Sequence, residues 1–203
     1  MAATAPLLVI VLGPAGSGKS SVSRHLARRI GGAHLDKDTI TGGLTEEILR
    51  LAGHDPHDRD NNPYYVERVM PLEYAALMSV AGDCLRAGTS AVLDAPFGAF
   101  LDDPQFLERQ AHDHDWPRAH RVVVRVVTDA DTIRRRIAHR GLSRDAWKLA
   151  HWDEFWARAS AREVCWSDVV SVDVDSSADP PDLTFLDRLF DSPAPWPSGK
   201  AGR

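Results

Sequence analysis

Lys19 and Ser20, two residues that can handle phosphate, end the run Gly13-Pro14-Ala15-Gly16-Ser17-Gly18-Lys19-Ser20. The run fits G-x-x-x-x-G-K-[ST], the phosphate-binding P-loop. Glycines let backbone N–H groups approach phosphate oxygens, the lysine reaches the β- and γ-phosphates, and the serine hydroxyl can ligate Mg²⁺. We therefore expect this run, together with Ser21, to bind ATP or GTP with Mg²⁺.

The segments on either side of this run have the character that a P-loop requires. Leu7 to Leu12 is a continuous apolar run, as expected of a strand buried on both faces. From Ser20 to Ile30, apolar residues recur every four positions and predict a helix. A chance glycine-rich turn is therefore disfavoured.

Three carboxylates follow the next two predicted strands. Asp36 and Asp38 come directly after the strand 33–35, and Asp94 ends the strand 90–94. Ligands of open α/β sheets bind at the carboxyl ends of the strands. We expect Asp38 to accept the proton of an acceptor hydroxyl, Asp36 to support the metal, and Asp94 to bind Mg²⁺ or contact the acceptor. Which of the three is the base stays open, and one of the first two can instead cap the following helix.

Cations that could stabilise a transferred phosphoryl group lie later in the chain. Arg136 and Arg140 are four residues apart, so they share one face of the predicted helix 130–139. We expect both to contact ATP phosphates, Arg136 as a catalytic residue, from a lid at about 134–150. The alternative is a solvated helix surface, and Arg144 is a weaker lid candidate.

Acceptor contacts are expected from two further residues beside Asp38 and Asp94. Arg59 lies in the polar, turn-rich segment 53–63, and Phe97 follows the strand that ends at Asp94. Long loops of this kind are often functional. A group of tryptophans near the lid is interpreted instead as core rather than as a stacking platform: Trp147, Trp152, Trp156 and Trp166.

The remaining pattern alternates helices with strands. Further strands are expected at 120–128 and 169–174, and helices at 44–52, 64–87, 104–112, 151–164 and 182–190. In the long helix 64–87, Pro71 should kink or restart the helix, and five residues are expected to form its buried stripe: Leu72, Ala75, Ala76, Met78 and Leu85. This alternation predicts an α/β fold with a five-stranded parallel sheet covered on both faces. Residues 1–191 are expected to form one domain, with a disordered tail at 192–203.

The composition limits the classes of partner. The 203 residues carry a net charge of −5 without a basic tract, so extended nucleic-acid binding is not favoured. Cys84 and Cys165 are expected to be free core thiols. Residues 1–6 lack the features of a signal peptide, and the apolar run after them is too short to span a membrane. We expect a cytoplasmic protein.

The P-loop, Asp36-x-Asp38, the run Val92 to Phe97 and Arg136-x-x-x-Arg140 together resemble the small P-loop kinases. Within them the chain is similar to the group that contains chloramphenicol phosphotransferase, zeta toxin and related kinases of the AAA-type ATPase class. The resemblance covers about residues 7–175. It implies a three-layer P-loop NTPase fold with a helical lid, transfer of the ATP γ-phosphate to a hydroxyl of a small molecule, an aspartate base at Asp36 or Asp38, and phosphate contacts from lid arginines.

Three functions remain in competition. The first is a kinase of a small molecule, with an antibiotic or another secondary metabolite as acceptor by analogy. The second is a toxin-like kinase of a nucleotide sugar or of a nucleic-acid end. The third is a switch that only hydrolyses its nucleotide, although no guanine-specificity motif is present. The sequence leaves open the acceptor, the choice between ATP and GTP, and the oligomeric state.

Overall fold

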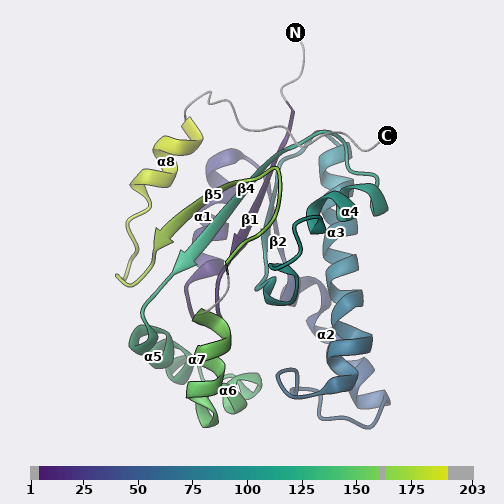
Figure 1. Cartoon of the computed structure of the whole chain (residues 1–203), viewed down its shortest axis with the longest axis vertical. Coiled ribbons are helices and arrows are strands. Elements are labelled where there is room, and N and C mark those ends of the chain that lie inside the picture. The colour runs from purple at the N-terminus through teal and green to yellow at the C-terminus, as the bar shows by residue number, and fades with distance from the viewer. Residues whose placement is uncertain (1–4, 161–162, 192–203) are drawn as a thin grey trace.

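Five parallel strands form one sheet in the order β2-β3-β1-β4-β5 (Figure 1). The computed structural model describes residues 5–160 and 163–191, so the tail predicted at 192–203 lies outside the described residues. The strands are β1 (Leu7–Leu12), β2 (Ala33–Asp36), β3 (Ala91–Asp94), β4 (His120–Val127) and β5 (Val170–Asp175). The predicted α/β fold with a five-stranded parallel sheet is confirmed.

Eight α-helices occur among the described residues, together with short helical turns. They are α1 (Lys19–Ile30), α2 (Lys37–Leu51), α3 (Met70–Arg86), α4 (Phe106–Asp113), α5 (Ala130–Arg140), α6 (Ala146–Ala150), α7 (Trp152–Ser160) and α8 (Thr184–Asp191). A π-helical turn, Tyr65–Val69, precedes α3, and 3-10 turns span Gly98–Phe100 and Ser143–Asp145.

Two hydrophobic clusters, one on each face of the sheet, make the three layers. On one face, Leu8 and Ile10 of β1 pack with Leu77 and Met78 of α3. On the other face, Val9 and Val11 of the same strand belong to the cluster formed with α1 and α8. The alternation of side chains along a buried strand explains why successive residues of β1 serve opposite layers.

The carboxyl ends of the strands face a separate group of helices. In Figure 1, α5, α6 and α7 gather beyond the arrowheads of β4 and β5, while α3 runs along the opposite side of the molecule. Asp36 of β2 and Asp94 of β3 are register partners, and Asp94 also pairs with Val11 of β1. The sheet therefore brings the two carboxylates predicted for the metal next to each other.

The helix after β2 begins earlier than predicted, at Lys37 rather than at residue 44. Asp36 is its N-cap, because its carboxylate accepts a hydrogen bond from the Thr39 backbone N–H at 3.0 Å. Gly42 and Gly43 disfavour helix locally, yet they lie inside it. Asp38 consequently stands in the first turn of a helix and not in a loop.

The predicted buried stripe of the long helix is partly wrong. Met78 and Leu85 are buried as expected, but Leu72 is 60% exposed, Ala75 is exposed and Ala76 is only half-buried. The π-helical turn places one extra residue in the helix just before Pro71 and rotates the face that follows it. The buried face of α3 includes the polar residue Glu73 beside Tyr74.

The helix α5 contains the beginning of the segment that is expected to form the lid. Residues 134–140 of that segment belong to α5, whose Ile133 and Ile137 are fully buried. Residues 143–160, which contain the short turn at Ser143–Asp145 together with α6 and α7, are called the lid below. Both cysteines are free, as expected, but Cys165 is exposed and lies outside any helix, so it is not a core thiol.

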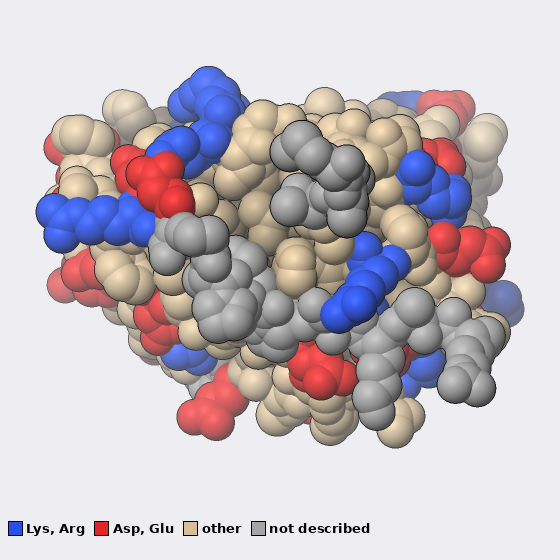
Figure 2. Space-filling model, turned by 90° about the horizontal axis from the view of Figure 1, so that it is seen from above, with Lys and Arg blue, Asp and Glu red and all other residues tan. Residues whose placement is uncertain are grey.

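The molecular surface at the amino end of β1 carries a mixture of charges. Figure 2 shows acidic and basic side chains interspersed with uncharged ones on the visible, described part of this face, without a continuous basic surface. Among the described helices, none combines the length and the apolar character that crossing a bilayer requires.

Candidate active site

The P-loop wraps from the end of β1 to the start of α1, and its glycines are required by its geometry. Gly16 and Gly18 have φ angles of +79° and +95°, which residues with a Cβ rarely adopt. A Cβ at Gly18 would lie 2.6 Å from Ser176 Oγ, and one at Gly16 would lie 2.8 Å from a side-chain carbon of Ile137. The loop therefore packs tightly against α5 and the end of β5 and is held in one shape.

Lys19 lies at the centre of the charged groups of this edge. Its Nζ donates a hydrogen bond to the backbone oxygen of Pro14 at 2.8 Å. The pKa of Lys19 is lowered to about 8, mainly by burial and also by nearby Arg140, although the carboxylates of Asp94, Asp38 and Asp36 oppose this shift. The three predicted carboxylates thus share one electrostatic environment with the P-loop lysine.

A candidate metal site lies where β2 and β3 end. His34, Asp36 and Asp94 each offer a ligand atom, and these atoms lie within 4.8 Å of one another. Asp94 is also held by the Ser23 hydroxyl, which donates to it at 3.0 Å. Two carboxylates beside a serine hydroxyl of α1 suit Mg²⁺, which prefers oxygen ligands. His34 was missed by sequence reasoning, because a lone histidine in a strand carries no ligand spacing.

Asp38 is surrounded by three cations. Its carboxylate lies 2.6 Å from Arg144 Nη1, 3.2 Å from Lys37 Nζ and 3.5 Å from Arg59 Nη1. Burial raises the pKa of Asp38, but the charges of Lys37, Arg144 and Arg59 outweigh burial and lower it below its ordinary value. The carboxylate is therefore ionised at neutral pH and paired with the lid through Arg144.

Arg59, for which an acceptor contact stays a prediction, reaches the same place from the segment 53–63. Besides Asp38, its guanidinium lies 3.6 Å from Glu73, a carboxylate that is only 2% exposed. Its Nε is buried without a hydrogen-bond partner among the described residues. Glu73 itself accepts hydrogen bonds from Lys37, Thr45 and Tyr65 at 2.6, 2.6 and 2.7 Å. These hydrogen bonds hold Glu73 in place, together with Lys37, which also contacts Asp38.

The two arginines of α5 have different surroundings. Arg136 lies beside the P-loop, since its Nη1 is 3.7 Å from the position of a Cβ on Gly18. That nitrogen is buried and has no partner among the described residues, while Nη2 donates to the Ala178 oxygen at 3.2 Å. Arg140 instead forms a two-point ion pair with Asp145 of the lid, at 2.6 and 2.8 Å. Arg136 has a nitrogen available for a nucleotide, whereas Arg140 would have to release Asp145.

Phe97 does not have the surroundings expected of an acceptor contact. Its side chain is fully buried, with ring centroids 5.3 Å from Tyr74 and 5.6 Å from Trp166. Its backbone N–H donates to the Tyr74 hydroxyl at 3.0 Å, and its φ of 55° is unusual for a bulky residue. In this conformation the side chain has no exposed surface for a ligand. It packs instead in the core beneath the turn that follows β3.

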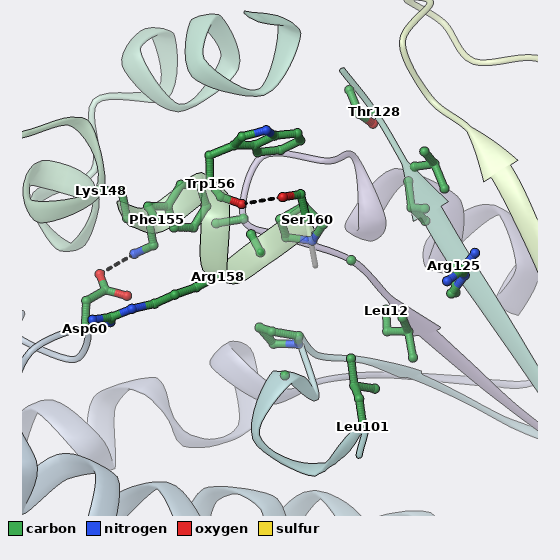
Figure 3. Close-up of a pocket in the computed structure, with 18 of the residues that line it drawn as sticks. Leu12, Asp60, Leu101, Arg125, Thr128, Lys148, Phe155, Trp156, Arg158 and Ser160 are labelled. Atoms are coloured by element: carbon green, nitrogen blue, oxygen red, sulfur yellow. Dashed lines mark hydrogen bonds and ion pairs between the residues drawn. The ribbon is translucent and has the colours of Figure 1, made fainter. Parts of the chain in front are cut away.

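A cavity of about 540 Å³ opens beside the P-loop and the lid (Figure 3). Its walls come from Gly13–Ala15, from the turn after β3, from the ends of β4 and β5, and from α6 and α7. Trp147, Phe155 and Trp156 of the lid line it. Of the four tryptophans expected to be core, only Trp166 is buried, at 5% exposure, so the core interpretation is wrong for the two that line the cavity.

A comparison with known protein families identifies the family of this chain. Residues 8–161 match the AAA domain family. The chain belongs to the AAA domain family. This confirms the AAA part of the resemblance seen in the sequence, while the similarity to chloramphenicol phosphotransferase and zeta toxin stays a prediction.

Curated relatives of this AAA domain protein match only a part of it. The cytidylate kinase of Mycobacterium leprae (strain Br4923) is 50% identical over 52 residues, which cover 26% of this chain and 23% of that enzyme. A cytidylate kinase of Mycolicibacterium paratuberculosis is 44% identical over 103 residues, covering 44% of this chain and 45% of the other. The chain thus spans less than half the length of these curated relatives.

Solved structures share the fold of this AAA domain over nearly its whole length. A putative kinase from Chloroflexus aurantiacus superimposes with a TM-score of 0.62 at 18% identity, covering 93% of this chain and 98% of the other. A sugar kinase from Janibacter sp. gives 0.61 at 17% identity, covering 92% and 93%. The tunicamycin resistance protein of Deinococcus radiodurans gives 0.54 at 11% identity, covering 91% and 92%. At these identities the likeness establishes a P-loop kinase-like fold.

Proposed function

We propose that the protein is a kinase that moves the γ-phosphate of ATP to a hydroxyl of a small molecule. One observation supports the proposal: Asp36 and Asp94 are register partners at the ends of β2 and β3, and these two carboxylates and Asp38 all lie near enough to raise the pKa of the P-loop lysine, Lys19. A nucleotide held by the P-loop and an alcohol beside Asp38 would then meet at the carboxyl edge of the sheet.

The residues have distinct roles in this reaction. Asp38 takes the proton of the acceptor hydroxyl, the hydroxyl oxygen attacks the γ-phosphorus, and the bond from that phosphorus to the β–γ bridging oxygen breaks to leave ADP. Lys19 and the P-loop N–H groups of Gly13 to Ser21 hold the phosphates. Arg136 adds its unpaired Nη1 on the nucleotide side, beside Gly18.

Mg²⁺ fits the groups at the end of β2 and β3. Asp36 and Asp94 with Ser20 would hold the ion directly or through water, and His34 lies at the same place. When bound, Mg²⁺ supplies positive charge that neutralises the phosphate oxygens. Arg140 contributes once the lid exchanges its Asp145 pair for a phosphate.

For the acceptor we propose an antibiotic or another secondary metabolite, which fits the shared fold of a tunicamycin resistance protein. A toxin-like kinase of a nucleotide sugar uses the same chemistry, and it differs in causing growth arrest on expression. A nucleotide-hydrolysing switch would release only inorganic phosphate. The identity of the phosphorylated product therefore separates these functions.

The test is a screen of hydroxylated metabolites and antibiotics with labelled ATP. We expect label in an organic product with the wild-type protein, and a loss of transfer of roughly 10²-fold or more in Lys19→Ala and in Asp38→Asn. Asp113→Asn, at an exposed carboxylate on α4, is the matched control and should keep full activity. Full transfer by a folded Asp38→Asn protein would move the base to Asp36 or Asp94.

A further inference from the structure

The cavity beside the P-loop has an aromatic wall contributed by the lid. Trp156 lines it, and its ring is stacked on Trp152 with the planes 8° apart and the centroids 6.0 Å apart. Trp147 also lines it and is stacked on His151 at 4.9 Å. Each indole that lines the cavity is thus braced by a neighbouring ring. Braced rings provide a flat surface at a low cost in side-chain entropy.

The opposite walls are largely apolar. Leu12, Pro14, Pro96, Leu101 and Val126 contribute to them, and Figure 3 shows Leu12 and Leu101 across the cavity from Trp156. The described hydroxyls of the lining are already engaged with backbone oxygens. Thr128 donates to Ser17 at 3.0 Å, and Ser160 donates to Trp156 at 2.7 Å. A ligand with many hydroxyl groups would therefore have to hydrogen-bond to the charged side chains of the lining, which already have partners.

The basic side chains of the described lining are all ion-paired. Lys148 lies 2.6 Å from Asp60, as Figure 3 shows, and Arg125 pairs with Asp173 through two hydrogen bonds. Arg158 pairs with Glu154 and also stacks over Trp147, with 5.5 Å between its guanidinium carbon and the ring centroid. A phosphate or carboxylate in this cavity would have to displace a carboxylate that is already paired with one of these cations, and the Lys148–Asp60 pair is the least exposed of the three, with side chains 12% and 25% exposed.

We propose that this cavity binds the acceptor, and that the acceptor is an uncharged alcohol built on a flat apolar or aromatic ring system. This inference rests on the proposed function for the transfer step, but not for the binding. A cavity of about 540 Å³ falls in the range of sites for drug-sized ligands. The wall chemistry disfavours two other acceptor classes, nucleoside monophosphates and sugar acids.

The cavity and Asp38 are joined by the lid. Lys148, which lines the cavity, donates to the backbone oxygen of Arg144 at 3.0 Å, and the Arg144 guanidinium pairs with Asp38. On the other side, Asp60 of the lining follows directly after Arg59, which contacts Asp38. Asp38 does not itself line the cavity, so the proposal requires that the acceptor hydroxyl extend past Lys148 toward Asp38 and take the place of Arg144 there.

Binding without nucleotide tests the acceptor class. Titration calorimetry measures Kd for three probes: 2-(2-naphthyl)ethanol as the flat neutral alcohol, sodium gluconate as the sugar acid, and cytidine monophosphate. We expect the naphthyl alcohol to bind at least tenfold more tightly than the other two. Trp156→Ala and Trp147→Ala should each weaken it about tenfold, while Trp156→Phe and the exposed-surface control Phe185→Ala should not.

The outcomes separate the two proposals. Tighter binding of gluconate or cytidine monophosphate overturns the inferred class, and so does unchanged naphthyl affinity in both tryptophan-to-alanine variants when thermal melts show that they are folded. Lys19→Ala should bind the naphthyl alcohol as the wild type does. If the alcohol binds but no hydroxyl probe is ever phosphorylated, the proposed kinase function fails and the binding class stands.

Discussion

We expect Lys19 to couple nucleotide binding to the uptake of a proton. Since burial lowers its pKa to about 8, the lysine without nucleotide loses its charge at a pH where an exposed lysine would keep it. A triphosphate attracts the protonated form, so above that pKa each binding event must take up a proton. Between about 8 and the ordinary value of 10.5, the unfolded chain holds more protons at this residue, so Lys19 itself adds stability as pH rises there.

We therefore expect ATP affinity to fall while the fold persists. Above pH 8 the Kd for ATP should rise toward a tenfold change per pH unit, because one proton is taken up per nucleotide bound. Calorimetry from pH 7 to pH 9.5 measures this slope. Lys19→Ala should bind ATP weakly with a flat profile, and an equal slope in that variant would show that another group titrates.

At the scale of elements, the lid is attached to the sheet edge by charges. Lys148 pairs with Asp60 of the segment 53–63 and lies 3.5 Å from the buried Asp145. Arg144 of the same lid pairs with Asp38 at the start of α2. These contacts join three segments that are distant in the sequence, and they are polar, so they can exchange with a ligand more readily than a packed core can.

Removing one of these contacts should loosen the lid alone. In Lys148→Met, Asp60 loses a charged hydrogen-bond partner and Asp145 loses a nearby cation, which lowers the free energy of local opening by about 1.5–3 kcal/mol. Hydrogen exchange of amides in 146–160 should then speed up by roughly tenfold or more, with β1 unchanged. Arg109→Met, which breaks an exposed pair with Asp103, is the control. Equal exchange in Lys148→Met and the wild type would mean that packing of the tryptophans holds the lid.

At the scale of the whole molecule, a buried polar network around Glu73 connects α3 with α2 and with the π-helical turn before α3. Glu73 of α3 is bonded to Lys37 and Thr45 of α2 and to Tyr65 of the π-helical turn. The side chains of Lys37 and Glu73 are 6% and 2% exposed. Losing one member of a buried pair leaves an uncompensated charge in a medium that solvates it poorly.

Glu73→Ala should therefore be strongly destabilising. We expect a loss of about 3–5 kcal/mol of unfolding free energy, a large part of the margin of a typical domain. Urea unfolding followed by circular dichroism measures it. Glu47→Ala on α2, which removes an exposed pair with Arg50, should cost less than about 1 kcal/mol. Similar midpoints for both variants would show that water replaces the lost partner.

The sequence predicts those elements of the fold that local interactions determine, and it fails where contacts between distant segments decide the structure. The strand Leu7–Leu12 and the P-loop follow from local pattern, because a buried strand must be apolar and the loop must be rich in glycine. The start of α2 was missed, since the cap of Asp36 and tertiary packing outweigh the two glycines inside the helix. The buried face of α3 was shifted by the π-helical turn, which periodicity does not reveal.

The sequence predicted those residues of the candidate site whose location follows from their position at the end of a strand. Asp36 and Asp94 meet because the ends of parallel strands share an edge. The surroundings of Phe97 and of the lid tryptophans depend on contacts between distant segments. Phe97 packs on Tyr74 and Trp166, and Trp156 faces a wall built from three strands and a loop, so residue type alone could not assign either role.

One consequence follows from the placement of the aromatic wall on a single stretch of chain. Trp147, Phe155 and Trp156 all lie between Ser143 and Ser160, whereas the groups proposed to bind the nucleotide lie on the P-loop, α1, α5 and the ends of β2 and β3. Substitutions of these aromatic residues that leave Arg144 and Asp145 in place should therefore change which compound is recognised without changing nucleotide binding. Natural variation among kinases of this architecture should therefore exchange this module as a unit, and a chimaera carrying another protein's stretch would inherit its selectivity.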